Sequence, residues 1–323
     1  MRIAVVIPLL NRGEYISRSI NSVLCQTLQP HEILVVDGGS SDAGPAIVKS
    51  YNNDKIKLVS QKGKGVSSAR NEGVLQSSSE FFAFLDADDE WNPWHLEKLM
   101  ALHRCFPKAG LYASAYEIVI SGRHRRIEFY ELPQFGIIKD YFRSAARGPS
   151  PIWTSVVGIE KRIFVETGGF PIHYQLGEDI DLWGRIALNH SIAYTSTIGG
   201  IYHQDSSNRL CNNNLTEVHQ PFVSSASIAI SNGKVPPQLI DSLKEYVSAL
   251  EAATIYHNIM KKDKATAIKR LLCQNNHISL SDSIILFFLL LFPFSGTVKH
   301  KLYQSRERQT ANNQSREFKR GRR

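Results

Sequence analysis

The sequence predicts an α/β fold in which a mainly parallel sheet is flanked by helices. Short apolar runs at residues 3–7, 32–36, 56–59 and 81–85 have the length and composition of buried strands. Amphipathic stretches separate these runs, and strands that alternate with helices are typical of parallel sheets. Polar residues follow each run, as expected where strand ends and helix N-termini converge on a ligand. The first half of the chain is therefore expected to be a doubly wound sheet.

Helices are predicted between these strands. The first is marked by apolar residues spaced as on one helix face, namely Ile16, Ile20, Val23 and Leu24. A second helix is expected over residues 66–75, and another is expected to open at Asn92 and Pro93, as N-cap and first-turn residue.

The remaining chain is less regular. Strands are expected near residues 111–113 and 156–159, and helices near residues 137–146 and 179–189. Helical patterns follow at residues 238–259 and 264–273. An unbroken apolar run then occupies residues 284–294, up to a final Pro-Phe.

The positive charge of the chain is concentrated at its end. The formal net charge is +8, and residues 299–323 contain nine Lys or Arg and two Glu. Nucleic-acid binding needs basic residues spread over a folded surface, so this distribution argues against it. The basic tail is predicted to be disordered.

Cysteine usage indicates a reducing compartment, and the N-terminal pattern is that of a strand. Cys25, Cys105, Cys211 and Cys273 are far apart, so neither a zinc motif nor a disulfide framework is expected, and we interpret them as buried thiols. Pro8 interrupts the first apolar run and no cleavage site follows, which favours a first strand over a signal peptide.

Three carboxylates follow the fourth apolar run directly: Asp86, Asp88 and Asp89. They would repel one another unless a cation lay between them, and Mg²⁺ or Mn²⁺ binds carboxylate oxygens together with substrate phosphates. The alternative is an acidic turn that caps the following helix. The place of these residues at a strand's carboxyl end favours the metal site.

Two further loops have the chemistry of nucleotide binding. Asp37 ends the second run, where its carboxylate can meet a base or ribose, and the two glycines after it allow close backbone approach. An ordinary strand-to-helix turn is compatible with the same residues. Lys62, Lys64 and Arg70 suit a diphosphate, although a solvated basic loop is the preferred interpretation for the two lysines.

A second acidic cluster, Glu178, Asp179 and Asp181, begins a predicted helix. Helix capping explains carboxylates at this place. The functional alternative is that one of them accepts a proton from an acceptor hydroxyl as a general base.

Taken in order, these segments resemble the inverting family 2 glycosyltransferases with the GT-A fold. The resemblance rests on Tyr15 and on the strings VIPLLN (6–11), VDGGSSD (36–42), GVSSARNEG (65–73), FLDADDEW (84–91) and GEDIDLW (177–183). It covers roughly the first 205 residues. It implies a GT-A domain at residues 1–210, with a nucleotide-binding half (1–110) and an acceptor half (111–210), followed by a helical appendage (211–298) and the basic tail.

The resemblance also implies roles for individual residues. Asp179, beside Glu178, would be the catalytic base, and Asp88 would face the metal-bound diphosphate. His203 or Arg209 would help to hold the metal or the phosphate. The residues implied in binding the nucleotide sugar are Pro8, Asn11, Asp37, Arg70, Asp86, Trp91 and Arg209.

The expected function is transfer of a sugar from a nucleotide-diphosphate sugar, with a bias toward UDP or dTDP, to a hydroxyl of a glycan or lipid-linked acceptor. Mg²⁺ or Mn²⁺ would assist, and the anomeric configuration would invert. Two alternatives are a sugar nucleotidyltransferase and a non-catalytic nucleotide-sugar-binding protein. The former usually has a Gly-rich loop with Arg and Lys after its first strand, whereas this chain has LLNRGE (9–14).

The apolar run at residues 284–294 is too short to span a bilayer, which needs ~20 apolar residues in a helix. Because the basic tail follows it, we expect peripheral attachment to the cytoplasmic face of the membrane. A buried core helix is the alternative.

Overall fold

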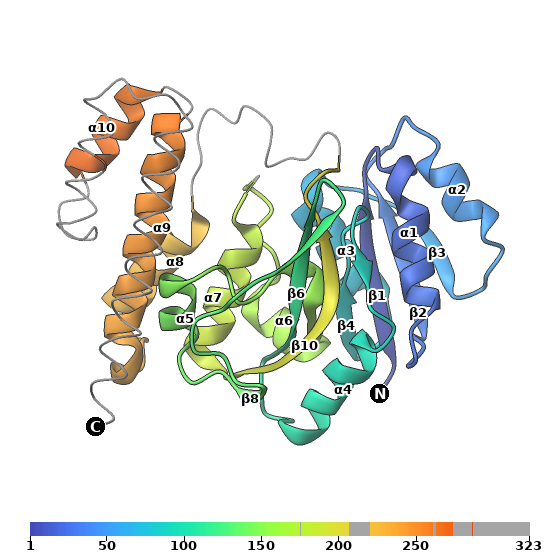
Figure 1. Cartoon of the computed structure of the whole chain (residues 1–323), viewed down its shortest axis with the longest axis horizontal. Helices are drawn as coiled ribbons and strands as arrows, with labels where there is room; N and C mark the ends of the chain where they lie inside the picture. Colours follow the sequence, from blue (N-terminus) through green and yellow to red (C-terminus); the bar gives the residue numbers. More distant parts are fainter. Residues whose placement is uncertain (175, 207–219, 261–262, 274–285, 287–323) are drawn as a thin grey trace. The chain divides into compact units, whose positions relative to one another are not determined.

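The computed structural model describes residues 1–174, 176–206, 220–260, 263–273 and 286 (Figure 1). The chain divides into two compact units. The first comprises Met1–Ile127, Leu132–Lys139 and Ile152–Cys211. The second comprises Glu128–Glu131, Asp140–Pro151 and Asn212–Arg323.

The first unit is built around one sheet whose main path has the order β3-β2-β1-β4-β9-β6-β10-β5. Its parallel strands are β1 (Ile3–Leu9), β2 (Glu32–Asp37), β3 (Ile56–Ser60), β4 (Phe81–Phe84), β6 (Leu111–Ile120) and β10 (Ile192–His203). β9 (Val157–Glu160) lies antiparallel between β4 and β6, so these two strands run in the same direction. The carboxyl ends of all the parallel strands therefore meet at one edge.

Three short strands complete the sheet with antiparallel pairing: β5 (Glu90–Trp91), β7 (Arg123–Arg126) and β8 (Phe135–Ile137). The expected α/β fold with a mainly parallel sheet is confirmed. The strands expected at residues 3–7, 32–36, 56–59 and 81–85 correspond to β1, β2, β3 and β4.

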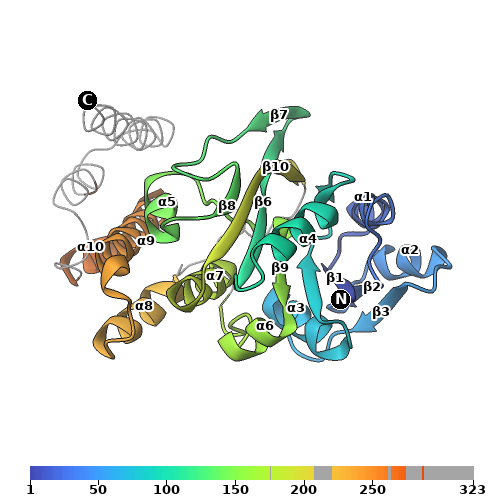
Figure 2. The ribbon, with the colours of Figure 1, turned by 90° about the horizontal axis from the view of Figure 1, so that it is seen from below.

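Helices cover both faces of this sheet (Figure 2). One face packs against α1 (Gly13–Leu24), α2 (Gly44–Ser50) and α4 (His95–Cys105), and their apolar side chains join Val5 and Ile7 of β1 in one core. The other face packs against α3 (Gly65–Gln76), α6 (Lys161–Thr167) and α7 (Glu178–Asn189), through Phe84, Phe164, Phe170 and Trp183. Because both faces are covered, the central strands are apolar throughout.

Two predicted helix starts differ from the structure. α4 begins at His95, because Trp91 pairs in β5 and the Asn92 side chain donates to the Ile198 carbonyl at 3.0 Å instead of capping a helix. The helix expected over residues 137–146 covers only α5 (Tyr141–Arg147), capped by Asp140, while Ile137 lies in β8.

The second unit is helical, with α5, α8 (Pro221–Ser231), α9 (Ile240–Met260) and α10 (Lys264–Cys273). Phe142 stacks on Phe222 with ring centroids 5.7 Å apart, and both rings contact Tyr246. Arg147 forms a bidentate pair with Glu245 at 2.7 and 3.0 Å. The helices predicted at residues 238–259 and 264–273 agree with α9 and α10.

Most of the predicted membrane segment and the whole basic tail lie outside the described residues. Leu286, the one described residue of the apolar run, is 1% exposed and clusters with Ile255, Ile259 and Ala267. Within the described part of the chain, no helix is both long and apolar enough to cross a membrane.

The prediction that the cysteines are buried is wrong for Cys25 and Cys105, which are exposed free thiols. Cys25 follows the last residue of α1 and Cys105 ends α4, and at both positions the side chain lies outside the apolar helix face. Cys211 and the Cys273 side chain lie outside the described part of the structure.

Candidate active site

The loops at the carboxyl edge of the sheet are joined to one another. The backbone N–H of Asn11, after β1, donates to Ser40 Oγ, after β2, at 3.0 Å. On the other side, the backbone N–H of His203, at the end of β10, donates to Asp89 Oδ1, after β4, at 3.1 Å. The polar segments predicted to follow the strands therefore gather along one edge.

The loops after β1 and β2 are shaped by Asn11 and Asp37. Asn11 adopts a φ of 51°, which Asn tolerates better than most residues, and its Oδ1 accepts the Ser41 N–H at 2.8 Å. Asp37 Oδ1 accepts the Ser40 N–H at 3.0 Å. Among the described residues, Asp37 Oδ2 has no hydrogen-bond partner, so it can accept a bond from a ligand. Pro8 is half-buried one strand away, opposite Val36.

The three carboxylates after β4 have separate partners. Asp86 Oδ1 lies 2.7 Å from Arg70 Nη2, and Asp88 Oδ2 lies 3.4 Å from Arg12 Nε. Asp89 is 1% exposed and accepts the Ser155 hydroxyl at 3.0 Å. Two arginines and a buried hydroxyl donor thus already contact the three carboxylates in the structure.

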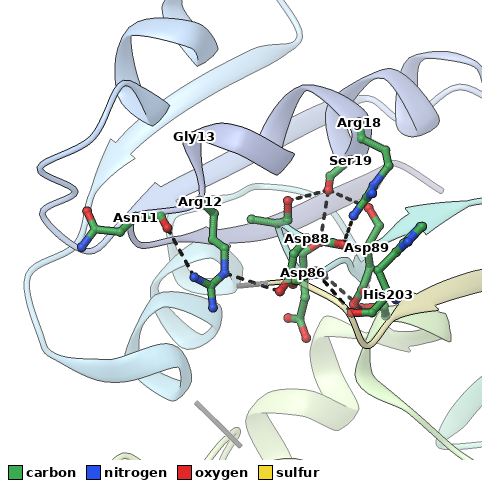
Figure 3. Close-up of polar contacts among 12 residues, drawn as sticks. Asn11, Arg12, Gly13, Arg18, Ser19, Asp86, Asp88, Asp89 and His203 are labelled. Carbon is green, nitrogen blue, oxygen red and sulfur yellow. Dashed lines mark hydrogen bonds and ion pairs between the residues drawn. The ribbon is translucent and has the colours of Figure 1, made fainter. Parts of the chain in front are cut away.

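Helix α1 holds the backbone of this acidic loop (Figure 3). Ser19 Oγ lies 2.6 Å from the carbonyl oxygen of Asp89 and 2.8 Å from that of Ala87, and Arg18 Nη2 donates to the carbonyl of Asp88. Neither residue was predicted from the sequence. Ser19 could have been noticed, since it is a polar residue on the otherwise apolar face of α1.

Burial and crowding set the charge of Asp89. Removal from water raises the pKa of its carboxyl well above the ordinary value, and the negative charges of Asp88 and Asp86 raise it further. A raised pKa favours the neutral form of Asp89, which leaves Asp86 and the 16% exposed Asp88 as the more readily ionised carboxyls of the loop.

Helix α7 opens with the second acidic cluster. Gly177, with a φ of 79°, turns the chain into the helix, and Glu178 and Asp179 occupy its first turn. Glu178 is buried, which raises its pKa to about 7, with the neighbouring charge of Asp179 adding to the effect and Arg70 opposing it. Asp179 is half-buried, and its Oδ2 accepts the Thr154 hydroxyl at 3.0 Å.

Arg70 connects the two acidic clusters. Its Nη1 lies 2.8 Å from Glu178 Oε1, its Nη2 lies 2.7 Å from Asp86 Oδ1, and its guanidinium lies over the Phe170 ring. Arg70 was predicted to contact the diphosphate, but it is 3% exposed. The structure instead places it between the loop after β4 and the start of α7, where it holds them together.

Trp91 and His203, which were predicted to contact the nucleotide sugar and the metal, lie close to the acidic loop. Trp91 is 4% exposed in the core, and its indole N–H donates to the Ser155 carbonyl. His203 Nε2 lies 3.0 Å from Glu90 Oε1, and this hydrogen bond lowers the pKa of Glu90. Arg209 lies outside the described residues.

The acidic loop fits a metal ion that the donor itself helps to hold. Within the described part of the chain, no group of three or more His, Cys, Asp or Glu side chains could hold a metal ion. Mg²⁺ usually takes one or two protein carboxylates and completes its shell with water and substrate phosphates. The half-buried Asp88 is compatible with that mode of binding, in which one protein carboxylate suffices.

Aromatic side chains lie next to Asp179. The Trp153 ring packs at a tilt against Tyr202, with ring centroids 4.3 Å apart, and against Tyr116 at 5.4 Å. Burial, reinforced by the charge of Asp179, raises the pKa of Tyr116. Trp153 and Tyr202 are half-buried, so part of this aromatic surface faces solvent.

The central sheet flanked by helices matches the GT-A fold of solved structures. Residues 4–149 match the family model described as Glycosyl transferase family 2. The predicted resemblance is thereby confirmed.

Relatives and solved structures agree with this assignment. An uncharacterized glycosyltransferase of Nostoc sp. is 38% identical over 114 residues, covering 34% of this chain and 35% of that protein. The UDP-Glc:alpha-D-GlcNAc-diphosphoundecaprenol beta-1,3-glucosyltransferase WfgD of Escherichia coli is 38% identical over 101 residues, covering 31% of this chain and 40% of that protein. The chain thus spans about a third of the length of such relatives.

The fold is also that of a solved structure. The crystal structure of S. aureus TarS 1-349 in complex with UDP-GlcNAc has a TM-score of 0.70 and 18% sequence identity. The match covers 94% of this chain and 92% of the TarS chain.

Proposed function

We propose that the chain is a divalent-metal-dependent, inverting glycosyltransferase. It would transfer a sugar from a nucleotide-diphosphate sugar to a hydroxyl of a glycan or a lipid-linked acceptor. The observation that carries this proposal is the buried Arg70, which bonds both Asp86 and Glu178 and so joins the acidic loop to the helix of the candidate base.

The donor would bind along the carboxyl edge from β2 to β4. Asp37 has a carboxylate oxygen without a partner among the described residues, which suits a base imide, and Asn11 and Pro8 shape the loop beside it. The TarS structure contains UDP-GlcNAc, and the WfgD relative is named for UDP-Glc. These similarities support a uridine nucleotide as the donor carrier.

Asp88 would hold a Mg²⁺ or Mn²⁺ ion, with Asp86 on the ribose side of the donor. When bound, such an ion neutralises negative charge on the departing diphosphate. Arg12 Nε lies 3.4 Å from Asp88 Oδ2, so the guanidinium compensates the charge of this carboxylate. It would also contact the phosphates of a bound donor.

Asp179 would accept the proton of the acceptor hydroxyl as that oxygen attacks the anomeric carbon. Its carboxylate is half-buried and fixed by hydrogen bonds on both oxygens, from Thr154 and from the Ile180 N–H. Direct attack breaks the bond to the diphosphate in a single displacement, so the anomeric configuration inverts and no protein nucleophile is needed. The half-buried rings of Trp153, which precedes Thr154 in the sequence, and of Tyr202 would suit the C–H face of an acceptor sugar.

The donor is best identified by calorimetry of the full chain with a panel of UDP- and dTDP-sugars, in Mg²⁺ or Mn²⁺ and again in EDTA. One donor is expected to bind with metal, and Asp88→Asn is expected to weaken it at least about 10-fold, the loss typical even of groups that only orient a metal ligand. Asp54→Asn is the matched control, because Asp54 is exposed before β3, at the opposite edge of the sheet. Equal affinity in EDTA and in Mg²⁺ would contradict the metal role.

A further inference from the structure

A short helical turn lies between the two acidic clusters. The 3₁₀ turn η1 (Thr154–Val156) precedes β9, and its residues Thr154 and Ser155 are 1% and 0% exposed. Buried hydroxyls need hydrogen-bond partners, and here the partners of two adjacent residues lie in two different parts of the candidate site.

Thr154 contacts the candidate base. Its Oγ1 donates to Asp179 Oδ2 at 3.0 Å, while Asp179 Oδ1 accepts the N–H of Ile180 at 2.7 Å. Each carboxylate oxygen carries two acceptor positions, so one remains on each oxygen for an acceptor hydroxyl. The two bonds restrict the rotation of the carboxylate and leave its basic electron pairs available.

Ser155 contacts the acidic loop at both ends. Its Oγ accepts the backbone N–H of Asp86 at 3.0 Å and donates to Asp89 Oδ2 at 3.0 Å. Its carbonyl accepts the indole N–H of Trp91. The loop that carries Asp88 is therefore held from its first residue to the strand that follows it.

We propose that Thr154 and Ser155 are positioning residues that set the placement of the base relative to the donor-binding loop. Thr154 aims the Asp179 carboxylate, and Ser155 holds the loop from Asp86 to Asp89. This inference rests on the proposed function, in which Asp179 acts on the acceptor and Asp88 on the donor. Because the two residues are adjacent, a shift of the turn would move both groups together.

The two hydroxyls are expected to affect different kinetic constants. Removing the Thr154 hydroxyl lets the Asp179 carboxylate rotate and leaves the donor loop unchanged. Thr154→Val should therefore lower kcat by about 10-fold or more, because small misplacements of a reacting group cost this much. The donor KM should stay unchanged. Removing the Ser155 hydroxyl loosens the donor loop, so Ser155→Ala should chiefly raise the donor KM. Thr154→Ser keeps a hydroxyl and should restore most of kcat.

A buried threonine outside the site provides the control. Thr195, 2% exposed in β10, donates to Thr197 at 3.2 Å, so Thr195→Val loses a buried hydroxyl without contact to either acidic cluster. Thr195→Val should change neither kcat nor the donor KM by more than about 2-fold, because the Thr195 hydroxyl bonds no described residue of the candidate site. If Thr154→Val changes kcat no more than Thr195→Val does, or if Thr154→Ser fails to restore it, the role of Thr154 is only structural.

Amide hydrogen exchange tests the same proposal without turnover. Ser155→Ala should speed exchange of the Asp86 amide and leave that of Ile180 unchanged, whereas Thr154→Val should speed exchange of the Ile180 amide and leave that of Asp86 unchanged. Unchanged exchange at both amides would overturn the proposal even if transfer is observed. If no donor is turned over by the wild-type chain but the exchange pattern holds, it is the proposed function that fails.

Discussion

Arg70 Nη1 lies 2.8 Å from Glu178 Oε1, although the two residues are 108 positions apart in the sequence. The same guanidinium reaches Asp86, so a single buried cation is shared by carboxylates from β4's loop and from α7. Without it, the buried Glu178 would lose its cationic partner, and so would Asp86, whose side chain is 25% exposed. Arg70 therefore links the two halves of the candidate site directly, in addition to the turn that carries Thr154 and Ser155.

Replacing Arg70 is expected to destabilise the first unit and abolish transfer. Arg70→Met should lower the free energy of unfolding by about 3 kcal/mol or more, because breaking a buried ion pair leaves charges unpaired. Arg70→Lys keeps the charge, but one ammonium lacks the planar fork that spans both carboxylates, so it should restore little activity. Urea unfolding checks stability, and Arg123→Lys on the exposed strand β7 is the control.

Glu178 is expected to make stability depend on pH. Burial raises its pKa to about 7 from an ordinary 4.5, so the folded chain binds this proton more tightly than the unfolded chain does. The free energy of unfolding therefore falls as pH rises from about 4.5 to about 7. Glu178→Gln removes this titrating group. Between pH 4.5 and 7, the unfolding free energy of the variant should therefore fall by about 1–3 kcal/mol less than that of the wild type.

Urea unfolding of both proteins at several pH values measures this difference. Asp89 also has a raised pKa, but it is present in both proteins, so the difference between the two curves isolates Glu178. Two parallel curves would show that Glu178 does not titrate in this range.

The C-terminal segment is proposed to attach the chain to the cytoplasmic face of the membrane. Deleting residues 299–323 removes most of the net positive charge, so binding to vesicles that contain phosphatidylglycerol should fall while binding to neutral vesicles stays unchanged. Vesicle sedimentation measures both. Undiminished sedimentation of the shortened chain would contradict attachment through the tail.

The apolar run before the tail needs a separate variant. Leu286 is 1% exposed and packs with Ile255 and Ile259, so Leu286→Asp should destabilise the second unit if the run belongs to its core. If Leu286→Asp is as stable as the wild type, the apolar run is not part of this core, and binding to the lipid surface is favoured.

Local patterns in the sequence predicted the fold and the places of the acidic clusters. An apolar run followed by Asp86 indicates the end of a strand, and Asp37 likewise ends the second run. Because parallel strands end at the same edge of a sheet, the sequence alone predicts that Asp37 and Asp86 lie at one edge. The start of α7 followed similarly from the amphipathic pattern after Glu178.

Contacts between distant residues were not predictable in this way. Thr154 and Ser155 carry no motif, and their partners lie 25 and 66 positions away. Arg70 was assigned to the diphosphate because its charge is visible in the sequence, whereas its burial depends on the packing of α3 against the sheet and on the Phe170 ring. The exposure of Cys25 and Cys105 depends likewise on which side of a helix end meets solvent.

The central claim is that Asp88 binds the donor and Asp179 activates the acceptor within one site. The most direct test is to measure donor affinity and transfer together for wild type, Asp88→Asn and Asp179→Asn, with the donor identified by calorimetry. Asp179→Asn should bind the donor like wild type and lose transfer by at least about 100-fold, as expected for a general base. Equal turnover of wild type and Asp179→Asn, or loss of donor binding in Asp179→Asn alone, would contradict the account.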